Sequence, residues 1–214
     1  MPAAGNETGR GPDRAPVASD PEEQARANLY GLISRLFCAP ADPNLLAEIS
    51  RAATVAAAEN PAVDMVTAWS ALQQACRSAY PALVRQEYDG LFIGVGRAEV
   101  TPYLSAYAVA SAPDRFLVAL RNQLAAWGLG RREGVFEIED HVSGMSDIMR
   151  CLIEGGHPLA EQKKFFDAFV HPGVELFCAA VQKSPNAVFY KPVAAFALAF
   201  FELERAAFDM GDMS

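Results

Sequence analysis

The stretch EYDGLFIGVGRAEVTPYLSAY, residues 87–107, decides how the rest of the chain is organised. It begins as an amphipathic helix in which Tyr88, Leu91 and Phe92 follow an i, i+3, i+4 spacing and therefore share one face. Gly94-Val95-Gly96 then breaks the helix, because glycine allows a tight turn. A dinucleotide-binding loop is disfavoured, since that motif follows a strand and carries a third glycine. The pattern predicts a helix face with two aromatics that leads into a loop.

Composition limits the classes of function. The chain has 214 residues, of which 51% are hydrophobic, which is enough for one substantial core. Its net charge of −8 opposes binding to nucleic acid or to an anionic membrane and favours cationic partners. No apolar run approaches the roughly 18 residues of a membrane-spanning helix, and no secretory signal is visible. We expect a cytoplasmic protein without stable membrane insertion.

Amphipathic patterns bounded by proline fill the chain after a tail, residues 1–20, that we expect to be disordered because it lacks large apolar side chains. No strand pattern is convincing. The sequence predicts an all-α, single-domain bundle of about eight or nine helices over residues 21–214, with a loop break after the central helix. We expect Val135 to Ile138 to be a loop.

Several boundaries and faces can be predicted in detail. The first helix starts at Asp20-Pro21, ends before Pro40 and is expected to bury Ala25, Leu29, Ile33, Leu36 and Phe37. A second helix starts at Asp42-Pro43 and stops at Asn60-Pro61, and the apolar face of a third reaches Tyr80. A helix from Pro113 ends at Gly128 and presents these residues inward: Phe116, Leu117, Leu120, Leu124 and Trp127. We also expect a break at His171-Pro172-Gly173 and a kink or a helix start at Pro192.

The four cysteines, Cys38, Cys76, Cys151 and Cys178, are far apart in the sequence, and each falls within an apolar helical pattern. No CxxC pair indicates zinc or redox chemistry. We therefore expect reduced, buried thiols and no bound cofactor.

The densest polar cluster is Glu137-Ile138-Glu139-Asp140-His141, which precedes a helix. One interpretation is catalytic or metal-binding: Glu139, Asp140 and His141, with His157, could serve a small metal-dependent hydrolase. The other is structural: Asp140 caps the helix and His141 forms a local hydrogen bond. Residues 131–161 carry a local charge of −4, which is either a solvated face or a surface for a peptide that carries arginines.

Two motifs, EYxxLFxGxG and PYxSxY, occur in that order in the central stretch, and EDHVSGMSDIM and FYKPVAAFALAFFELE follow further along the chain. Together they resemble the TorD/DmsD/NarJ-like family of cytoplasmic redox-enzyme maturation chaperones. The resemblance covers about residues 22–205. One departure is that the family commonly has a histidine and then proline-tryptophan after the FF pair, where this chain has Phe169 and then Pro172-Gly173.

The resemblance implies an all-helical chaperone that is not an enzyme and binds the twin-arginine signal peptide and the apo form of an exported molybdoenzyme. Carried over by position, the peptide-binding residues would be Tyr88, Leu91, Phe92, Pro102, Ser105, Tyr107, Asp140 and His141. Residues at the spacing of the first three are as often plain core. The resemblance is compatible with a monomer or with a dimer that exchanges helices.

Overall fold

The computed structural model describes residues 20–53, 63–94, 97–108, 113–129 and 140–211. Within these ranges the structure is all-α, as predicted, and its one β-type pairing is an isolated bridge between Tyr103 and His141. The elements are α1 (Pro21–Cys38), α2 (Pro43–Arg51), α3 (Val63–Ser78), α4 (Pro81–Tyr88), η1 (Asp89–Ile93), α5 (Ser105–Ala108), α6 (Pro113–Ala126), α7 (Val142–Glu154), α8 (Leu159–Phe165), η2 (Phe166–Val170), α9 (His171–Lys183) and α10 (Tyr190–Gly211), where η denotes a π-helical turn. The predicted tail and the loop at 135–138 lie outside the described residues, apart from Asp20, the N-cap of α1.

Helix starts follow the predicted signals. Asp20 and Asp42 cap α1 and α2, each accepting backbone N–H groups, with proline at the first helical position. The end of α2 at Arg51 comes earlier than the stop predicted at Asn60-Pro61. α10 begins at Tyr190, so Pro192 lies in its first turn and marks the start of the helix. α6 ends before Gly128, which adopts φ 66° as a C-terminal glycine should.

Three predicted apolar faces need correction. In α1 the buried face includes Ala27, Tyr30, Ile33, Leu36 and Phe37, while Ala25 is exposed and Leu29 is half-buried. Both faces of this helix carry apolar residues, so periodicity alone selected the wrong residues for the N-terminal part of the buried face. In α6 the predicted face does lie inward, but only Phe116 and Leu120 are fully buried, while Leu124 and Trp127 are half-buried against the core. Tyr80, predicted to extend the face of the third helix, is 72% exposed.

The predicted break at His171-Pro172-Gly173 is wrong. The chain remains helical from α8 through η2 into α9, and the π-helical turn ends where His171 begins α9. Pro172 has no N–H group to donate, and a π-type turn just before it accommodates that missing bond without ending the helix. Gly173 is needed for packing here, because a Cβ at this position would lie 2.6 Å from the Leu104 carbonyl oxygen.

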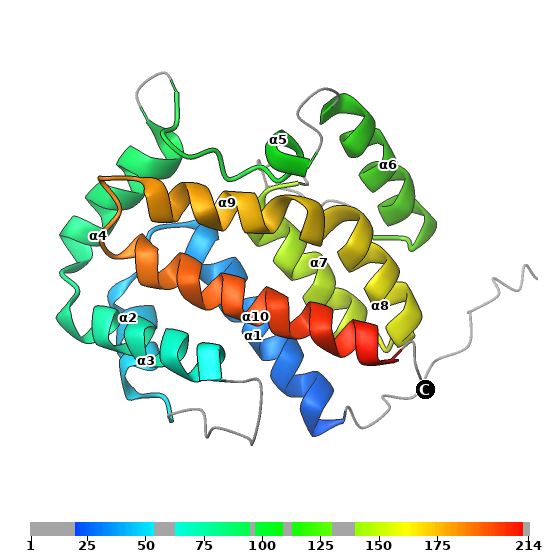
Figure 1. The fold of residues 1–214 in the computed structure, drawn as a ribbon, viewed down its shortest axis with the longest axis horizontal. Coiled ribbons are helices and arrows are strands. Elements are labelled where there is room, and N and C mark those ends of the chain that lie inside the picture. The colour runs from blue at the N-terminus through cyan, green and yellow to red at the C-terminus, as the bar shows by residue number, and fades with distance from the viewer. Residues whose placement is uncertain (1–19, 54–62, 95–96, 109–112, 130–139, 212–214) are drawn as a thin grey trace, which may run out of the picture.

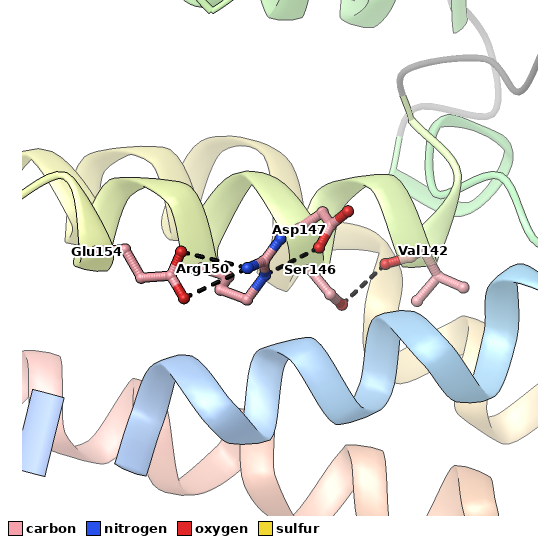
Figure 2. Close-up of polar contacts among 5 residues, drawn as sticks. All are labelled: Val142, Ser146, Asp147, Arg150 and Glu154. Atoms are coloured by element: carbon pink, nitrogen blue, oxygen red, sulfur yellow. Dashed lines mark hydrogen bonds and ion pairs between the residues drawn. The ribbon is translucent and has the colours of Figure 1, made fainter. Parts of the chain in front are cut away.

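α1 packs along α7 (Figure 2). Gly31 of α1 makes room for this contact. A Cβ on Gly31 would lie 3.1 Å from Cδ of Arg150. Arg150 extends along α7 and donates to Asp147 at 3.1 Å and to Glu154 at 3.2 Å (Figure 2). The buried Ser146 hydroxyl, also on α7, donates to the Val142 carbonyl at 2.9 Å, so this hydroxyl has its hydrogen-bond partner within the helix (Figure 2).

The core is rich in aromatics and centres on α10, which packs against α9 and α3 (Figure 1). A buried polar cluster ties α10 to α1: Arg26 makes a two-bond contact with Glu204 at 2.7 and 2.8 Å, and the Tyr30 hydroxyl donates to the same carboxylate at 3.0 Å. Burial, and next to it contact with this carboxylate, raise the pKa of Tyr30 well above its usual value.

The cysteines differ in environment. All four are free thiols. Cys76 and Cys178 are buried as predicted, Cys151 is half-buried, and Cys38 is exposed, which corrects the expectation of four buried thiols. Burial raises the pKa of Cys76 to about 11 and that of Cys178 to about 12. In the described part of the chain, no helix has the length and apolar character needed to cross a membrane.

Candidate functional site

The central stretch changes its helical geometry before it breaks. α4 runs into the π-helical turn η1, whose last bond joins Gly94 N–H to the Asp89 carbonyl at 2.8 Å. Gly94 has φ 63°, and a Cβ there would lie 2.2 Å from the Arg97 carbonyl oxygen, so only glycine fits. Further on, the Val100 N–H donates to the Leu91 carbonyl at 2.9 Å and brings the chain back against the turn.

The side chains of Tyr88, Leu91 and Phe92 lie in the core. They are 5%, 0% and 6% exposed. The Tyr88 hydroxyl donates to the Phe37 carbonyl at 3.0 Å, and the Phe92 ring meets Tyr190 edge to face with centroids 5.0 Å apart. The face predicted from the spacing is real, and it joins α4 and η1 to α1 and α10.

The second half of the motif is bound to the start of α7. The Pro102 carbonyl accepts the Val142 N–H at 2.9 Å, and the Leu104 N–H donates to the Asp140 carbonyl at 2.9 Å. The Ser105 N–H, at the start of α5, donates to the Asp140 carboxylate at 3.2 Å. The structure therefore brings together Pro102, Ser105, Asp140 and His141, although 35 positions separate Ser105 from Asp140.

The predicted cap of α7 is assigned to the wrong residue. His141, not Asp140, is the N-cap, and its Nδ1 accepts the Ser143 N–H at 3.1 Å. Both side chains are buried, Asp140 at 1% and His141 at 3% exposed. Burial lowers the pKa of His141 to about 4, so the imidazole is neutral at physiological pH.

Tyr107 joins the two groups of residues. Its hydroxyl donates to the Thr101 carbonyl at 2.9 Å, and its ring lies 6.2 Å from that of Phe177, which also contacts Phe92 at 6.3 Å. Burial, together with Cys178, raises the pKa of Tyr107 to about 12. Among the eight predicted residues, Tyr107 is the one that is half-buried and not buried.

The acidic surface predicted over residues 131–161 is largely compensated where the structure describes it. Asp147 and Glu154 both pair with Arg150 (Figure 2). Glu161 contacts His157 Nδ1 at 2.9 Å, and Asp140 is buried. The remaining acidic residues of this region, Glu133, Glu137 and Glu139, lie outside the described residues.

The hydrolase alternative gains no support from the described residues. These contain no group of three or more histidine, cysteine, aspartate or glutamate side chains placed to hold a metal ion. Glu139 lies outside the described part. His157 forms a hydrogen bond with Glu161 and meets Trp127 edge to face, with ring centroids 5.7 Å apart.

Two carboxylates of the central stretch that sequence reasoning missed bind the connection between α9 and α10, which runs beside α4 (Figure 1). Glu87 accepts the backbone N–H groups of Val188, Phe189 and Tyr190 at 2.8, 3.0 and 2.8 Å. Glu99 accepts the Ser184 hydroxyl at 2.5 Å and the Asn186 amide at 2.7 Å. These hydrogen bonds lower the pKa of Glu99. No local sequence signal pairs residues this far apart.

Comparison with protein families identifies the chain. A protein-family model described as the nitrate reductase delta subunit matches residues 59–179, which is more than half of the 214 residues. The chain belongs to the nitrate reductase delta subunit family. The matched region contains the whole central stretch and its junction with α7. A comparison with curated proteins finds no significant match.

The nitrate reductase delta subunit family is a family of redox-enzyme maturation chaperones, which confirms the resemblance seen in the sequence. Members of the family work with molybdoenzyme subunits of the nitrate reductase type. The fold described above is thus that of an all-helical protein from a chaperone family.

Proposed function

We propose that this protein binds the twin-arginine signal peptide and the apo form of an exported molybdoenzyme in the cytoplasm, and holds the enzyme until its cofactor is inserted. The observation that carries the proposal is the family match over residues 59–179, which spans the central stretch and the start of α7. No covalent step is required of the chaperone.

The geometry around α5 supports a binding role. Hydrogen bonds between residues 102–105 and residues 140–142 hold this short segment firmly although α5 has only 4 residues: the Pro102 carbonyl accepts one, and the Leu104 and Ser105 N–H groups donate the others. Tyr103 and Tyr107 are half-buried and Ala106 is exposed, so the segment presents aromatic edges beside a small side chain. Such a surface suits the apolar part of a signal peptide.

The buried residues of the proposed peptide site would position the segment that contacts the peptide and would not contact the peptide themselves. Asp140 and His141 position the segment from Pro102 to Tyr107, while Phe92 supports it through Phe177. In this proposal Tyr107 and its exposed neighbour Ala106 contact the peptide, and the others fix the shape of the surface that does so.

Calorimetric titration of signal peptides tests the proposal. The probes are the signal peptides of the molybdoenzymes encoded in the same genome, each paired with a peptide in which both arginines are lysine. Binding of one peptide, weakened in its lysine control, is the expected result, because arginine makes two parallel hydrogen bonds to a carboxylate where lysine offers a point charge. If none of these peptides binds to folded protein, the proposed function is wrong.

One substitution tests the α5 surface itself. Ala106→Arg places a bulky cation on this exposed position and should weaken peptide binding at least about tenfold, or about 1.4 kcal/mol. Ala206→Arg, at an exposed position of α10, is the matched control and should leave binding unchanged. Equal affinity of the two variants would remove the α5 surface from the peptide site.

A further inference from the structure

A groove lies between the outer face of α4 and η1 and the connection from α9 to α10. Its volume is about 370 Å³, within the range of roughly 300–1,000 Å³ that is usual for ligand pockets. Its lining residues are Leu83, Gln86, Glu87, Gly90, Leu91, Glu99 and Asn186. Of these, only Leu91 belongs to the peptide-binding set predicted from the sequence.

Large exposed apolar side chains lie on the segments that form the groove. Leu83 is 60% exposed, Val188 76% and Ile93 61%. Val188 lies at the groove because its N–H bonds to the Glu87 carboxylate, and Ile93 ends the π-helical turn that carries Gly90. Gly90 itself faces open space, since a Cβ built on it would meet nothing within 4 Å. A cluster of exposed apolar side chains around a hollow is typical of an interaction site.

The charge of the groove is negative and uncompensated. Both charged residues in its lining, Glu87 and Glu99, are acidic. All their hydrogen-bond partners are neutral: backbone N–H groups for Glu87, and a hydroxyl and an amide for Glu99. Within the described ranges neither carboxylate forms an ion pair, whereas Asp147 and Glu154 share Arg150.

We propose that this groove binds the arginine pair of the client signal peptide together with the apolar residue next to it. The inference rests on the proposed function and assigns one part of the peptide to one surface. A guanidinium is complementary to a carboxylate that has neutral partners only, and the aliphatic stem of arginine can pack along Leu83 and Val188. The hydrogen bonds to the α9–α10 connection keep both carboxylates fixed before the peptide arrives.

The two carboxylates and the exposed side chains of Leu83 and Val188 together determine which kind of peptide segment the groove can bind. A purely apolar segment would leave two desolvated charges unpaired, which is unfavourable. A purely cationic segment would leave Leu83 and Val188 uncovered. A peptide with arginines beside an apolar stretch satisfies both, and this is the composition of a twin-arginine signal.

Gly90 allows the groove to be filled without disturbing the fold. Gly90→Leu places a side chain into open space on a helical turn, where leucine is a better helix former than glycine. Gly90→Ala is the matched control, because it gives the same gain in helix propensity with far less bulk. We expect Gly90→Leu to weaken binding of the signal peptide at least about tenfold by calorimetry, and Gly90→Ala to leave it within about twofold.

A charge substitution gives a second, independent measurement. Glu99→Gln keeps an oxygen that can accept the Ser184 hydroxyl and removes one negative charge from the groove. We expect it to weaken the arginine peptide about tenfold and the lysine peptide less, which narrows the difference between the two peptides. Leu176→Ala, at an exposed leucine of α9, should change neither.

The outcomes separate this inference from the proposed function. Strong binding by the unmodified protein that is lost in Gly90→Leu and kept in Gly90→Ala supports the groove. Binding that survives both Gly90→Leu and Glu99→Gln overturns the groove and leaves the proposed function intact. Absence of binding of any signal peptide to the unmodified protein overturns both.

Discussion

Glu87 on α4 caps Tyr190, the first residue of α10, across 103 positions of sequence, with its carboxylate 2.8 Å from the Tyr190 nitrogen. The same carboxylate accepts the N–H groups of Val188 and Phe189, so one side chain satisfies three donors at the start of the longest helix. The glutamate of the central EYDGLF stretch therefore has a definite structural role.

Glu87→Ala should lower the free energy of unfolding by about 2 kcal/mol, because it leaves these N–H groups without their charged acceptor. Urea denaturation followed by circular dichroism measures the change. Glu48→Ala is the control, since Glu48 forms an exposed pair with Arg35 and its removal should change stability by less than about 1 kcal/mol. Similar losses in the two variants would contradict the capping role.

Substitution of Glu204 should reduce the stability of the protein more than substitution of Glu87 does. Its carboxylate is 3% exposed and binds Arg26 and the Tyr30 hydroxyl, so Glu204→Ala leaves a partly buried guanidinium and a buried hydroxyl without their partner. Loss of one partner of such a pair costs about 3–5 kcal/mol. Thermal unfolding should show a large decrease in Tm, and an unchanged Tm would mean that Arg26 finds another partner.

His141 should make stability depend on pH. Its pKa is about 4 in the folded protein against an ordinary 6.5, so the unfolded chain takes up a proton that the folded chain excludes. Its contribution is complete above about pH 6.5 and is lost as the pH falls toward 4, on the order of 3 kcal/mol in all.

His141→Asn keeps a side chain that can cap α7 but cannot be protonated in this range. The decrease in stability between pH 6.5 and 4 should therefore be smaller in this variant, as measured by urea denaturation at several pH values. Parallel pH profiles for the two proteins would show that another group dominates this window.

Replacing Gly173 and Gly90 with alanine should change the stability of the protein in opposite directions. Gly173→Ala drives a Cβ to 2.6 Å from the Leu104 carbonyl oxygen and should destabilise the protein by about 1–3 kcal/mol. Gly90→Ala enters open space and should stabilise it by up to about 1 kcal/mol. Both changes can be measured in one denaturation series, and a change of the same sign in both would contradict the geometry at one of them.

Much of the local structure was predictable. Asp20-Pro21 and Asp42-Pro43 start helices, Gly128 follows the end of another, and the spacing of Tyr88, Leu91 and Phe92 gives a buried face. These signals act within one or two turns, where capping and φ preference operate. They were sufficient for the all-α class, and the order of motifs was sufficient for the family.

The candidate site was predictable only in part. The sequence drew attention to Asp140 and His141, but their roles depend on which donor is nearby: Ser105 N–H lies against Asp140, so His141 takes the cap. The π-helical turn η2, which replaces the expected break at His171, also has no local sign beyond Pro172.

The sequence by itself determined the helical class, most helix starts and the family, because each of these depends on residues close together along the chain. Only the tertiary structure decided which side chains face solvent and which partners the carboxylates have. Glu87 and Glu99 bind a connection about a hundred and about eighty-five residues away, respectively, and leave their charge uncompensated at the surface. Periodicity cannot predict such contacts, since they depend on where the connection between α9 and α10 lies relative to Glu87 and Glu99.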